Sequence, residues 1–417
     1  MTLAWIKKRH LSEYWSEYWS EYWLIFALTG LISCGGNETR ELNPVSDDSE
    51  SPTTRGVTDD EVVFGSHTDL TGNIAIWGVG SINGARMRFD DVNEAGGIHG
   101  RKIRFVVEDT QYEIPRAIQA ANKLINRDKV FAMVLNLGTP TNNAVLTQQL
   151  RAGIPNLFPL TGARSMVEPY HDLKFTQRGI YYYEIRAGVK YFMERGKETP
   201  CVIHHDSDYG QEILEGAQDQ LKSMGRELAM VSAYKPSETE FTASLIRLRN
   251  AGCDVVLMGT AHRDTILILE TARKMGFEAT FVGNNAAYGQ VIAEQQSGSG
   301  EGYHAFVHIA KLYKDDTLPQ NVIDWWNDYE SRFGTEPGIP AMEGYRAADL
   351  VVLALEKAGP VLTIESFIQA LEQITDYTDI FGYRIAFGPG DHKGVDESVL
   401  SVVENGRWKT LATSISY

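Results

Sequence analysis

Residues 65–102 read GSHTDLTGNIAIWGVGSINGARMRFDDVNEAGGIHGRK, and this stretch decides the fold class. A predicted strand at 61–66 ends in a turn rich in Thr and Gly. An amphipathic helix over 84–93 follows, and it stops at the Ala-Gly-Gly of 95–97. In an open α/β sheet, loops at the carboxyl ends of strands are where ligands bind. The stretch therefore predicts an α/β protein with a ligand site close to its first strand.

The same alternation of strands and helices continues along the chain. Apolar runs of only a few residues between helices indicate a parallel sheet covered on both faces. The pattern restarts near residue 187 and builds a second unit of similar size, and 380–408 is predicted to be a β-rich tail. We therefore predict two doubly wound parallel-sheet lobes joined by a multi-strand hinge. Further strands are predicted at 103–108, 131–135, 154–158, 201–205, 227–234, 254–259 and 280–283, and further helices at 115–126, 141–151, 187–195, 210–224, 241–251, 264–275, 325–333 and 344–358.

The composition of the chain bears on which kind of molecule it can bind. The chain has 417 residues, of which 43% are hydrophobic and 23% charged, and its formal net charge is −16. An acidic surface repels phosphate backbones, so nucleic acid is not an expected partner.

The first 33 residues have the order of a secretory signal peptide. A basic patch at 7–9 precedes an apolar run at 24–32, which ends in Leu31-Ile32-Ser33-Cys34. The apolar run is far shorter than the roughly 20 residues that a membrane span needs. Residues 34–56 are polar and rich in Gly, Ser and Pro, as a flexible tether should be. The tandem Ser-Glu-Tyr-Trp repeats at 12–23 are interpreted as an expansion within the discarded signal.

Two cysteines besides Cys34 begin predicted strands. Cys201 opens CVIHHD and Cys253 opens CDVVLMG, so the two strands could be neighbours. A disulfide in an oxidising compartment and a pair of buried free thiols both remain open. We favour free thiols, because parallel neighbours seldom meet disulfide geometry.

Several motifs, in order, resemble the leucine/isoleucine/valine-binding family of type I periplasmic solute-binding proteins. The opening stretch is similar to the family's "LTG…WG…NGA…N..GGI.GRK" pattern. Further similar motifs are VVED (106–109), GTPTN (138–142), IPNLF (154–158), DSDYG (206–210), FTASLIRL (241–248), GYRAA (344–348) and ALEKAG (354–359).

This resemblance implies a bilobed receptor that delivers a small ligand to the permease of an ABC importer. It implies a first lobe of 57–178 plus 303–380 and a second lobe of 179–302 plus 381–417. Because the Leu-Ile-Ser-Cys sequence also looks like a bacterial lipobox, we expect a lipid on Cys34. The expected location is the periplasm or cell envelope, and the expected state is a membrane-anchored monomer.

Ligand-facing residues are expected at the starts of helices in the first lobe. Gly138, Thr139 and Thr141 offer hydroxyls and backbone N–H groups that suit a carboxylate, although Thr139 could also be a plain helix cap. In the family this loop holds the ligand carboxylate. The resemblance implies that Thr161 and Gly162, on the next loop of the same lobe, also contact the ligand.

Aromatic walls are expected from Trp77 and Tyr209. Trp77 is predicted to lie in the loop after the first strand, where the family often places an aromatic residue, although a buried Trp is usually core. Tyr209 is expected to stack on the ligand and to hydrogen-bond to it once the lobes close.

The second lobe departs from the amino-acid binders of the family. Asn285 stands where those proteins carry a Glu that neutralises the ligand's ammonium, and Ala261 or His262 stands where they carry a Tyr. An ammonium buried without a carboxylate is costly. An amide, a carboxylic acid or a more apolar molecule therefore fits at least as well as an amino acid.

Metal, cofactor and catalytic roles are not expected. His204 and His205 alternate faces on a strand, so they cannot easily share a metal ion. The chain has no G-x-S-x-G elbow and no P-loop, and its glycines at 78–84 miss the dinucleotide spacing by one residue. The alternatives to a transport receptor are a ligand sensor for a signalling partner and, third, an enzyme on a doubly wound fold.

Overall fold

The computed structural model describes residues 54–415. Met1–Ser51 and Pro52–Tyr417 form separate units, and everything below concerns the second one. The expected signal peptide, Cys34 and residues 34–53 of the expected tether lie outside the described residues.

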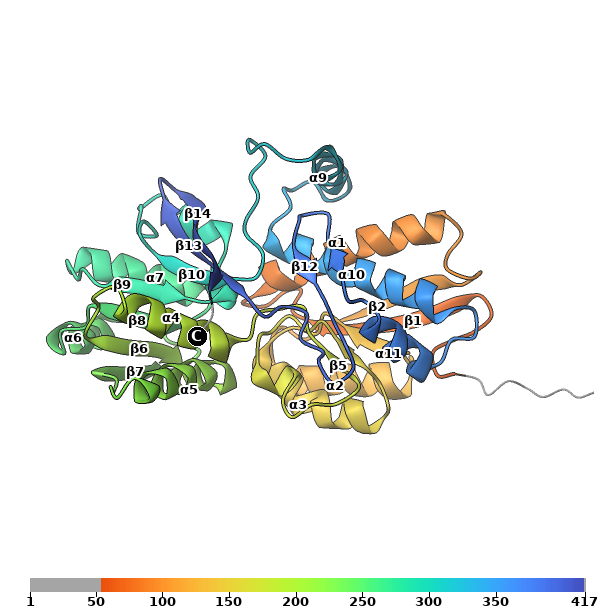
Figure 1. Cartoon of the computed structure of the whole chain (residues 1–417), viewed down its shortest axis with the longest axis horizontal. Helices are drawn as coiled ribbons and strands as arrows, with labels where there is room; N and C mark the ends of the chain where they lie inside the picture. The colour runs from red at the N-terminus through yellow and green to blue at the C-terminus, as the bar shows by residue number, and fades with distance from the viewer. Residues whose placement is uncertain (1–53, 416–417) are drawn as a thin grey trace, which may run out of the picture. The chain divides into compact units, whose positions relative to one another are not determined.

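Two separate sheets form the cores of two lobes, which lie side by side in Figure 1. The sheet of the first lobe has the strand order β2-β1-β3-β4-β5, and all of its pairings are parallel. The predicted parallel α/β class is confirmed for this lobe. Its strands are β1 (Glu61–Thr68), β2 (Lys102–Asp109), β3 (Ala132–Val134), β4 (Asn156–Leu157) and β5 (Lys174–Phe175).

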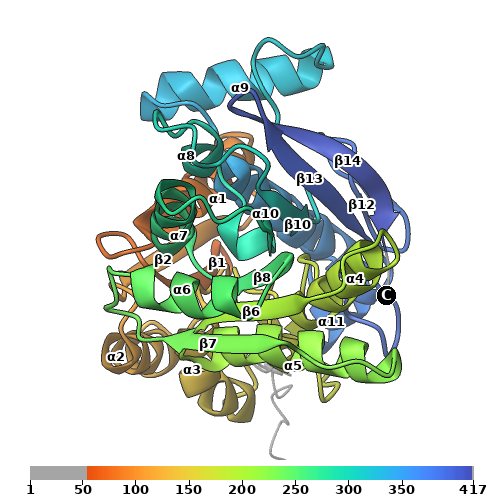
Figure 2. The ribbon, with the colours of Figure 1, turned by 90° about the vertical axis from the view of Figure 1, so that its left-hand side faces the viewer.

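The sheet of the second lobe has the order β14-β13-β10-β9-β8-β6-β7. Its strands from β10 to β7 are parallel, while β13 and β14 form an antiparallel hairpin on the β10 side (Figure 2). A two-stranded ribbon of β11 (Tyr377–Thr378) and β12 (Arg384–Ile385) lies outside both sheets. The strands of the second lobe are β6 (Pro200–His205), β7 (Met230–Tyr234), β8 (Val255–Gly259), β9 (Thr280–Gly283), β10 (His304–Val307), β13 (Ser398–Glu404) and β14 (Arg407–Ile415).

Helices cover the faces of both sheets, as the short apolar strands require. In the first lobe, α1 and α10 pack together on one face and α2 and α3 on the other. The helices are α1 (Ala75–Glu94), α2 (Ile114–Asn126), α3 (Thr139–Arg151), α4 (Tyr181–Met193), α5 (Asp208–Ser223), α6 (Thr242–Asn250), α7 (His262–Lys274), α8 (Gln290–Ala293), α9 (Gln320–Phe333), α10 (Ile339–Ala358) and α11 (Ile364–Glu372), with 3-10 turns η1 (Arg164–Met166) and η2 (Asn285–Ala287).

Two glycines let α1 and α10 touch backbone to backbone. A Cβ on Gly84 would lie 2.1 Å from the carbonyl oxygen of Ala341, and one on Gly344 would lie 1.9 Å from that of Ser81. Any larger side chain would force the helices apart. The Asn-Gly-Ala of the opening stretch is therefore a helix-packing motif.

The expected lobe boundaries are wrong at two places. The structure places β10 in the sheet of the second lobe, because it pairs with β9 and with β13, so this lobe continues past residue 302. Residues 381–397 remain in the first lobe, where the Phe387 ring lies 5.4 Å from that of Phe175 and 5.9 Å from that of Phe158. The chain enters the second lobe again only at β13.

Helices begin earlier than predicted at the edge where ligands are expected. Trp77 lies in the first turn of α1, and Thr139 and His262 are the first residues of α3 and α7, so none of the three is on a loop. The loop before α1 is short because the Asp69 carboxylate accepts hydrogen bonds from the backbone N–H groups of Gly72 and Ile74.

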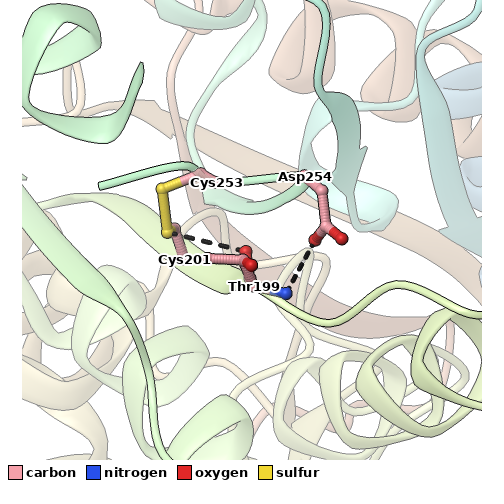
Figure 3. The surroundings of a disulfide bond; sticks show 4 residues. All are labelled: Thr199, Cys201, Cys253 and Asp254. Carbon is pink, nitrogen blue, oxygen red and sulfur yellow. Dashed lines mark hydrogen bonds between the residues drawn. A yellow bond between two sulfur atoms is a disulfide. The ribbon is translucent and has the colours of Figure 1, made fainter. Parts of the chain in front are cut away.

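A disulfide joins Cys201 to Cys253, with the two Cα atoms 5.8 Å apart (Figure 3). Our prediction of two free thiols is therefore wrong. Our objection concerned residues paired within a parallel ladder, but Cys201 is in register with Val256, and Cys253 lies before β8 begins. The Asp254 carboxylate accepts a hydrogen bond from the Thr199 N–H at 2.9 Å, which holds the two strand starts together beside the bridge.

Candidate functional site

The helix starts at the carboxyl ends of the strands in both lobes surround one buried cavity. This inner cavity has a volume of about 70 Å³ and opens into an outer cleft of about 710 Å³. The two spaces share Ile74 and Tyr112 of the first lobe and His205 and Ala261 of the second. Enclosed, largely apolar spaces of this kind between lobes are where proteins bind small molecules.

Four aromatic side chains line the inner cavity. They are Trp77 and Tyr112 from the first lobe, Tyr181 from the start of α4, and Tyr209 from the first turn of α5. The rings of Tyr181 and Tyr209 meet edge to face with centroids 5.0 Å apart. Trp77 and Tyr209, which the sequence analysis named, thus both line this cavity, whereas Tyr112 and Tyr181 were missed.

The hydroxyl group of Tyr209 is hydrogen-bonded within the second lobe. It donates to the carbonyl oxygen of Thr260 at 3.1 Å, and it exchanges a hydrogen bond with the Asn284 side chain. Tyr209 therefore lines the cavity while its hydroxyl group already has partners in its own lobe, and a hydrogen bond from it to a ligand stays a prediction.

The polar floor of the cavity comes from the start of α3. Gly138 and Thr139 line the cavity, and the Thr139 hydroxyl lies 2.7 Å from that of Thr161. The first N–H groups of a helix have no partner within the helix. This corner can therefore both donate to and accept from a polar ligand atom.

Thr141 and Gly162 support this floor without lining the cavity. The buried Thr141 hydroxyl donates to the carbonyl oxygens of Leu137 and Gly138, so it closes the turn that starts α3. The Gly162 carbonyl oxygen accepts from the Tyr181 N–H at 2.8 Å, and a Cβ on Gly162 would lie 2.3 Å from the Gly179 oxygen. Gly162 is thus a point of close approach where the chain crosses between lobes.

His262 closes the cavity from the second lobe by stacking on Trp77. The ring centroids are 5.7 Å apart, and the His262 side chain lines the outer cleft on the other side of the contact. Burial lowers the pKa of His262 to about 4, so the imidazole is neutral at pH 7.

Arg178 is the site residue that sequence reasoning missed most clearly. It follows β5 on the first crossing between the lobes, is only 2% exposed, and lines the cavity. Its guanidinium carbon lies 4.5 Å from the Trp77 ring centroid, and its Nε donates to Glu343 Oε2 at 2.7 Å. The sequence offered one clue to Arg178, its position in the segment that joins the two predicted lobes. Position alone does not show that a side chain is buried.

The two lobes touch across the mouth of the cleft. The Asn143 amide donates to Asp208 Oδ2 at 2.8 Å, and the Arg164 N–H donates to Glu212 Oε1 at 2.8 Å. Together with the Trp77–His262 contact, these bonds describe a closed arrangement in which both lobes bound the same cavity.

A family model described as a periplasmic binding protein matches residues 61–407. The chain belongs to the periplasmic binding protein family. It is 24% identical over 291 residues to a leucine-, isoleucine-, valine-, threonine- and alanine-binding protein of Pseudomonas aeruginosa, which covers 70% of this chain and 76% of that one.

Solved structures share the fold of this periplasmic binding protein. A branched-chain amino acid ABC transporter protein from Thermus thermophilus with bound valine has a TM-score of 0.77 at 18% identity, covering 87% of this chain and 98% of that one. A fatty acid ABC transporter substrate-binding protein from Thermomonospora curvata has a TM-score of 0.76 at 21% identity, covering 87% and 94%. The predicted type I periplasmic binding protein fold is confirmed.

The family places this protein outside the cytoplasm. Within residues 54–415, none of the helices combines the length and the apolar character needed to cross a membrane.

Asn285 of this periplasmic binding protein lies behind the cavity, not on its wall. Its amide donates to Glu184 Oε2 at 2.9 Å and to the Gly179 carbonyl oxygen at 3.2 Å, and it accepts from Arg178 Nη1 at 3.4 Å. Asn285 therefore ties the second lobe to the crossing segment and positions Arg178.

Glu184 is a buried carboxyl group in this hinge. Burial raises its pKa to about 7, although the hydrogen bonds from Asn285 and the charge of Arg178 oppose the rise. A carboxyl group of this kind makes folding depend on pH.

Glu184→Gln is expected to flatten the pH dependence of stability. Between its ordinary pKa of 4.5 and about 7, Glu184 is protonated in the folded protein but ionised in the unfolded chain. The wild type should therefore lose stability as the pH rises from about 4.5 to about 7, by up to about 3 kcal/mol from this group. The measurement is the free energy of unfolding at pH 5 and pH 8. Glu194→Gln, at the exposed end of the same helix, is the control and should keep the wild-type slope.

Proposed function

We propose that this protein is the solute receptor of an ABC importer and binds a small, mainly apolar organic molecule in the inner cavity. The observation that carries the proposal is an enclosed cavity with walls from both lobes: Trp77 and Thr139 on one side, and Tyr209 and Ala261 on the other. A ligand touches both lobes only when they are closed, so binding shifts the population towards closure. The membrane permease would recognise the closed form.

The relatives support a binding role for the whole chain. The names of the three proteins compared above describe amino-acid binding, bound valine and fatty acid transport. The fold therefore serves ligands with and without an amino group, and no enzyme stands among these three. We also propose that Cys34 carries a lipid anchor, for which the mass of the mature protein purified from its host is the test.

Trp77→Ala is expected to weaken ligand binding about thirtyfold. The substitution removes a buried aromatic wall, and the loss of such apolar contact costs about 2 kcal/mol of binding free energy. The measurement is isothermal titration calorimetry with hits from a thermal-shift screen of amino acids, amides, aromatic acids and fatty acids.

Trp325→Ala is the matched control. Trp325 is buried against Tyr345 and Phe381 and does not line the cavity, so its loss should lower the melting temperature but leave the affinity of the folded protein unchanged. Equal affinities of the Trp77→Ala variant and the wild type would refute the assignment of this cavity as the binding site.

A further inference from the structure

Arg178 offers the cavity a hydrogen-bond donor that the protein itself does not use. Its Nε is bound by Glu343, and its Nη1 donates to Asn285 Oδ1 at 3.4 Å. Its Nη2 is buried and has no hydrogen-bond partner among residues 54–415. A buried donor without a partner costs free energy, and a charged one costs more. Because Arg178 lines the cavity, a ligand is the natural acceptor for this third nitrogen.

The same guanidinium is held rigidly in place. The Trp77 ring covers its face at 4.5 Å, and Glu343, itself buried, holds its edge. A guanidinium fixed in this way presents its free Nη2 to one acceptor oxygen, and a charge-assisted bond from it to a carboxylate is stronger than a neutral one.

No carboxylate lines the inner cavity within the described residues. The acids of the outer cleft are Glu113, Asp206, Asp208 and Asp264. Glu343 and Glu184 contact Arg178 and Asn285 respectively. An ammonium group in the cavity would be next to the cation Arg178 and would lack a counter-charge. Because Glu343 already pairs with Arg178, the cavity offers no counter-charge to a positive group, while the unused Nη2 donor favours an acceptor such as a carboxylate.

We propose that the ligand is a small monocarboxylate with an aromatic or branched apolar body and no α-amino group, and that its carboxylate binds Arg178 Nη2 beside the Thr139–Thr161 hydroxyl pair. This inference rests on the proposed function and names its substrate class. The apolar body lies between Trp77, Tyr112, Tyr181 and Tyr209, whose rings supply area without charge.

The test compares matched probes on the wild-type protein by isothermal titration calorimetry. The pairs are 4-methylpentanoate against leucine and 3-phenylpropanoate against phenylalanine, with 3-phenylpropanamide as the neutral analogue. Each pair has the same apolar body, so the comparison isolates the amino group or the charge. We expect one acid of the set to bind at least tenfold more tightly than its amino acid and than the amide.

Variants of Arg178 separate a direct contact from a positioning role. Arg178→Gln should reduce the preference for acid over amide to less than threefold, whereas a residue that only positions the wall would weaken acid and amide equally. Should Arg178→Gln fail to fold, the double variant Arg178→Met with Glu343→Leu removes both charges together and gives the same readout.

The outcomes distinguish the inference from the function on which it rests. Tighter binding of leucine or phenylalanine than of its matched acid would overturn the inference and leave the receptor function standing. Equal binding of acid and amide would also overturn it. Absence of binding by every acid, amide and amino acid in the set would count against both.

Discussion

Glu343→Leu is expected to destabilise the protein by about 3 to 5 kcal/mol, because removal of one partner of a buried ion pair leaves the other charge unpaired. Glu343 is fully buried on α10, accepts from Arg178 Nε at 2.7 Å, and lies 3.3 Å from His308 Nε2. Burial alone would raise the pKa of Glu343, but Arg178 and His308 together lower it to about 2. The carboxylate is therefore charged at every pH at which the protein would be studied. Chemical denaturation monitored by circular dichroism measures the loss.

Two further variants make this prediction specific. Glu356→Leu lies on the exposed side of the same helix and should change the free energy of unfolding by no more than about 0.5 kcal/mol. Adding Arg178→Met to Glu343→Leu removes both charges and should recover much of the loss. A Glu343→Leu protein as stable as the wild type would show that the pair does not hold the hinge.

Replacing Cys201 and Cys253 by Ala is expected to cost about 4 kcal/mol of stability. The bridge spans 52 residues, and closing a loop of this length in the unfolded chain restricts its entropy by about that amount. Both side chains are buried, so the Ala residues also lose some packing. The measurement is denaturant unfolding of the wild type with and without a reductant and of the double variant.

The reductant supplies the control. It should shift the unfolding midpoint of the wild type towards that of the double variant and leave the double variant itself unmoved. If the wild type unfolds at the same midpoint with and without reductant present throughout, the cross-link contributes nothing to stability.

The sequence predicts the local elements of this protein well and the long-range ones less well. Short apolar runs are sufficient to find β1, β6 and β8, because a strand buried on both faces is rich in apolar residues. The strand β10 lies between β9 and β13, and one of these two partners, Ser398–Glu404, comes almost a hundred residues later. A local sequence pattern does not reveal so distant a partner. The prediction therefore assigned β10 to the wrong lobe.

In the candidate binding site, too, residues placed by local structure were predicted better than residues placed by long-range contacts. Trp77, Thr139 and Tyr209 stand beside recognisable strand-to-helix turns, so the prediction placed them correctly at the cavity. Arg178 reaches the cavity only because α10 supplies Glu343 and η2 supplies Asn285 to hold it there. Asn285 was predicted to touch the ligand, but the same packing turns it towards Glu184.

Neither lobe is continuous along the chain, so the first lobe cannot be completed until late in its synthesis. The face of β1 that carries Phe64 is completed by α10, which begins some 270 residues after β1 ends. At ordinary translation speeds of about 5–20 residues per second, a ribosome needs roughly 15 to 55 seconds to reach it. Until then the nascent chain has no means of finishing its first hydrophobic core. A chain built in this order can complete its first core only after α10 has emerged.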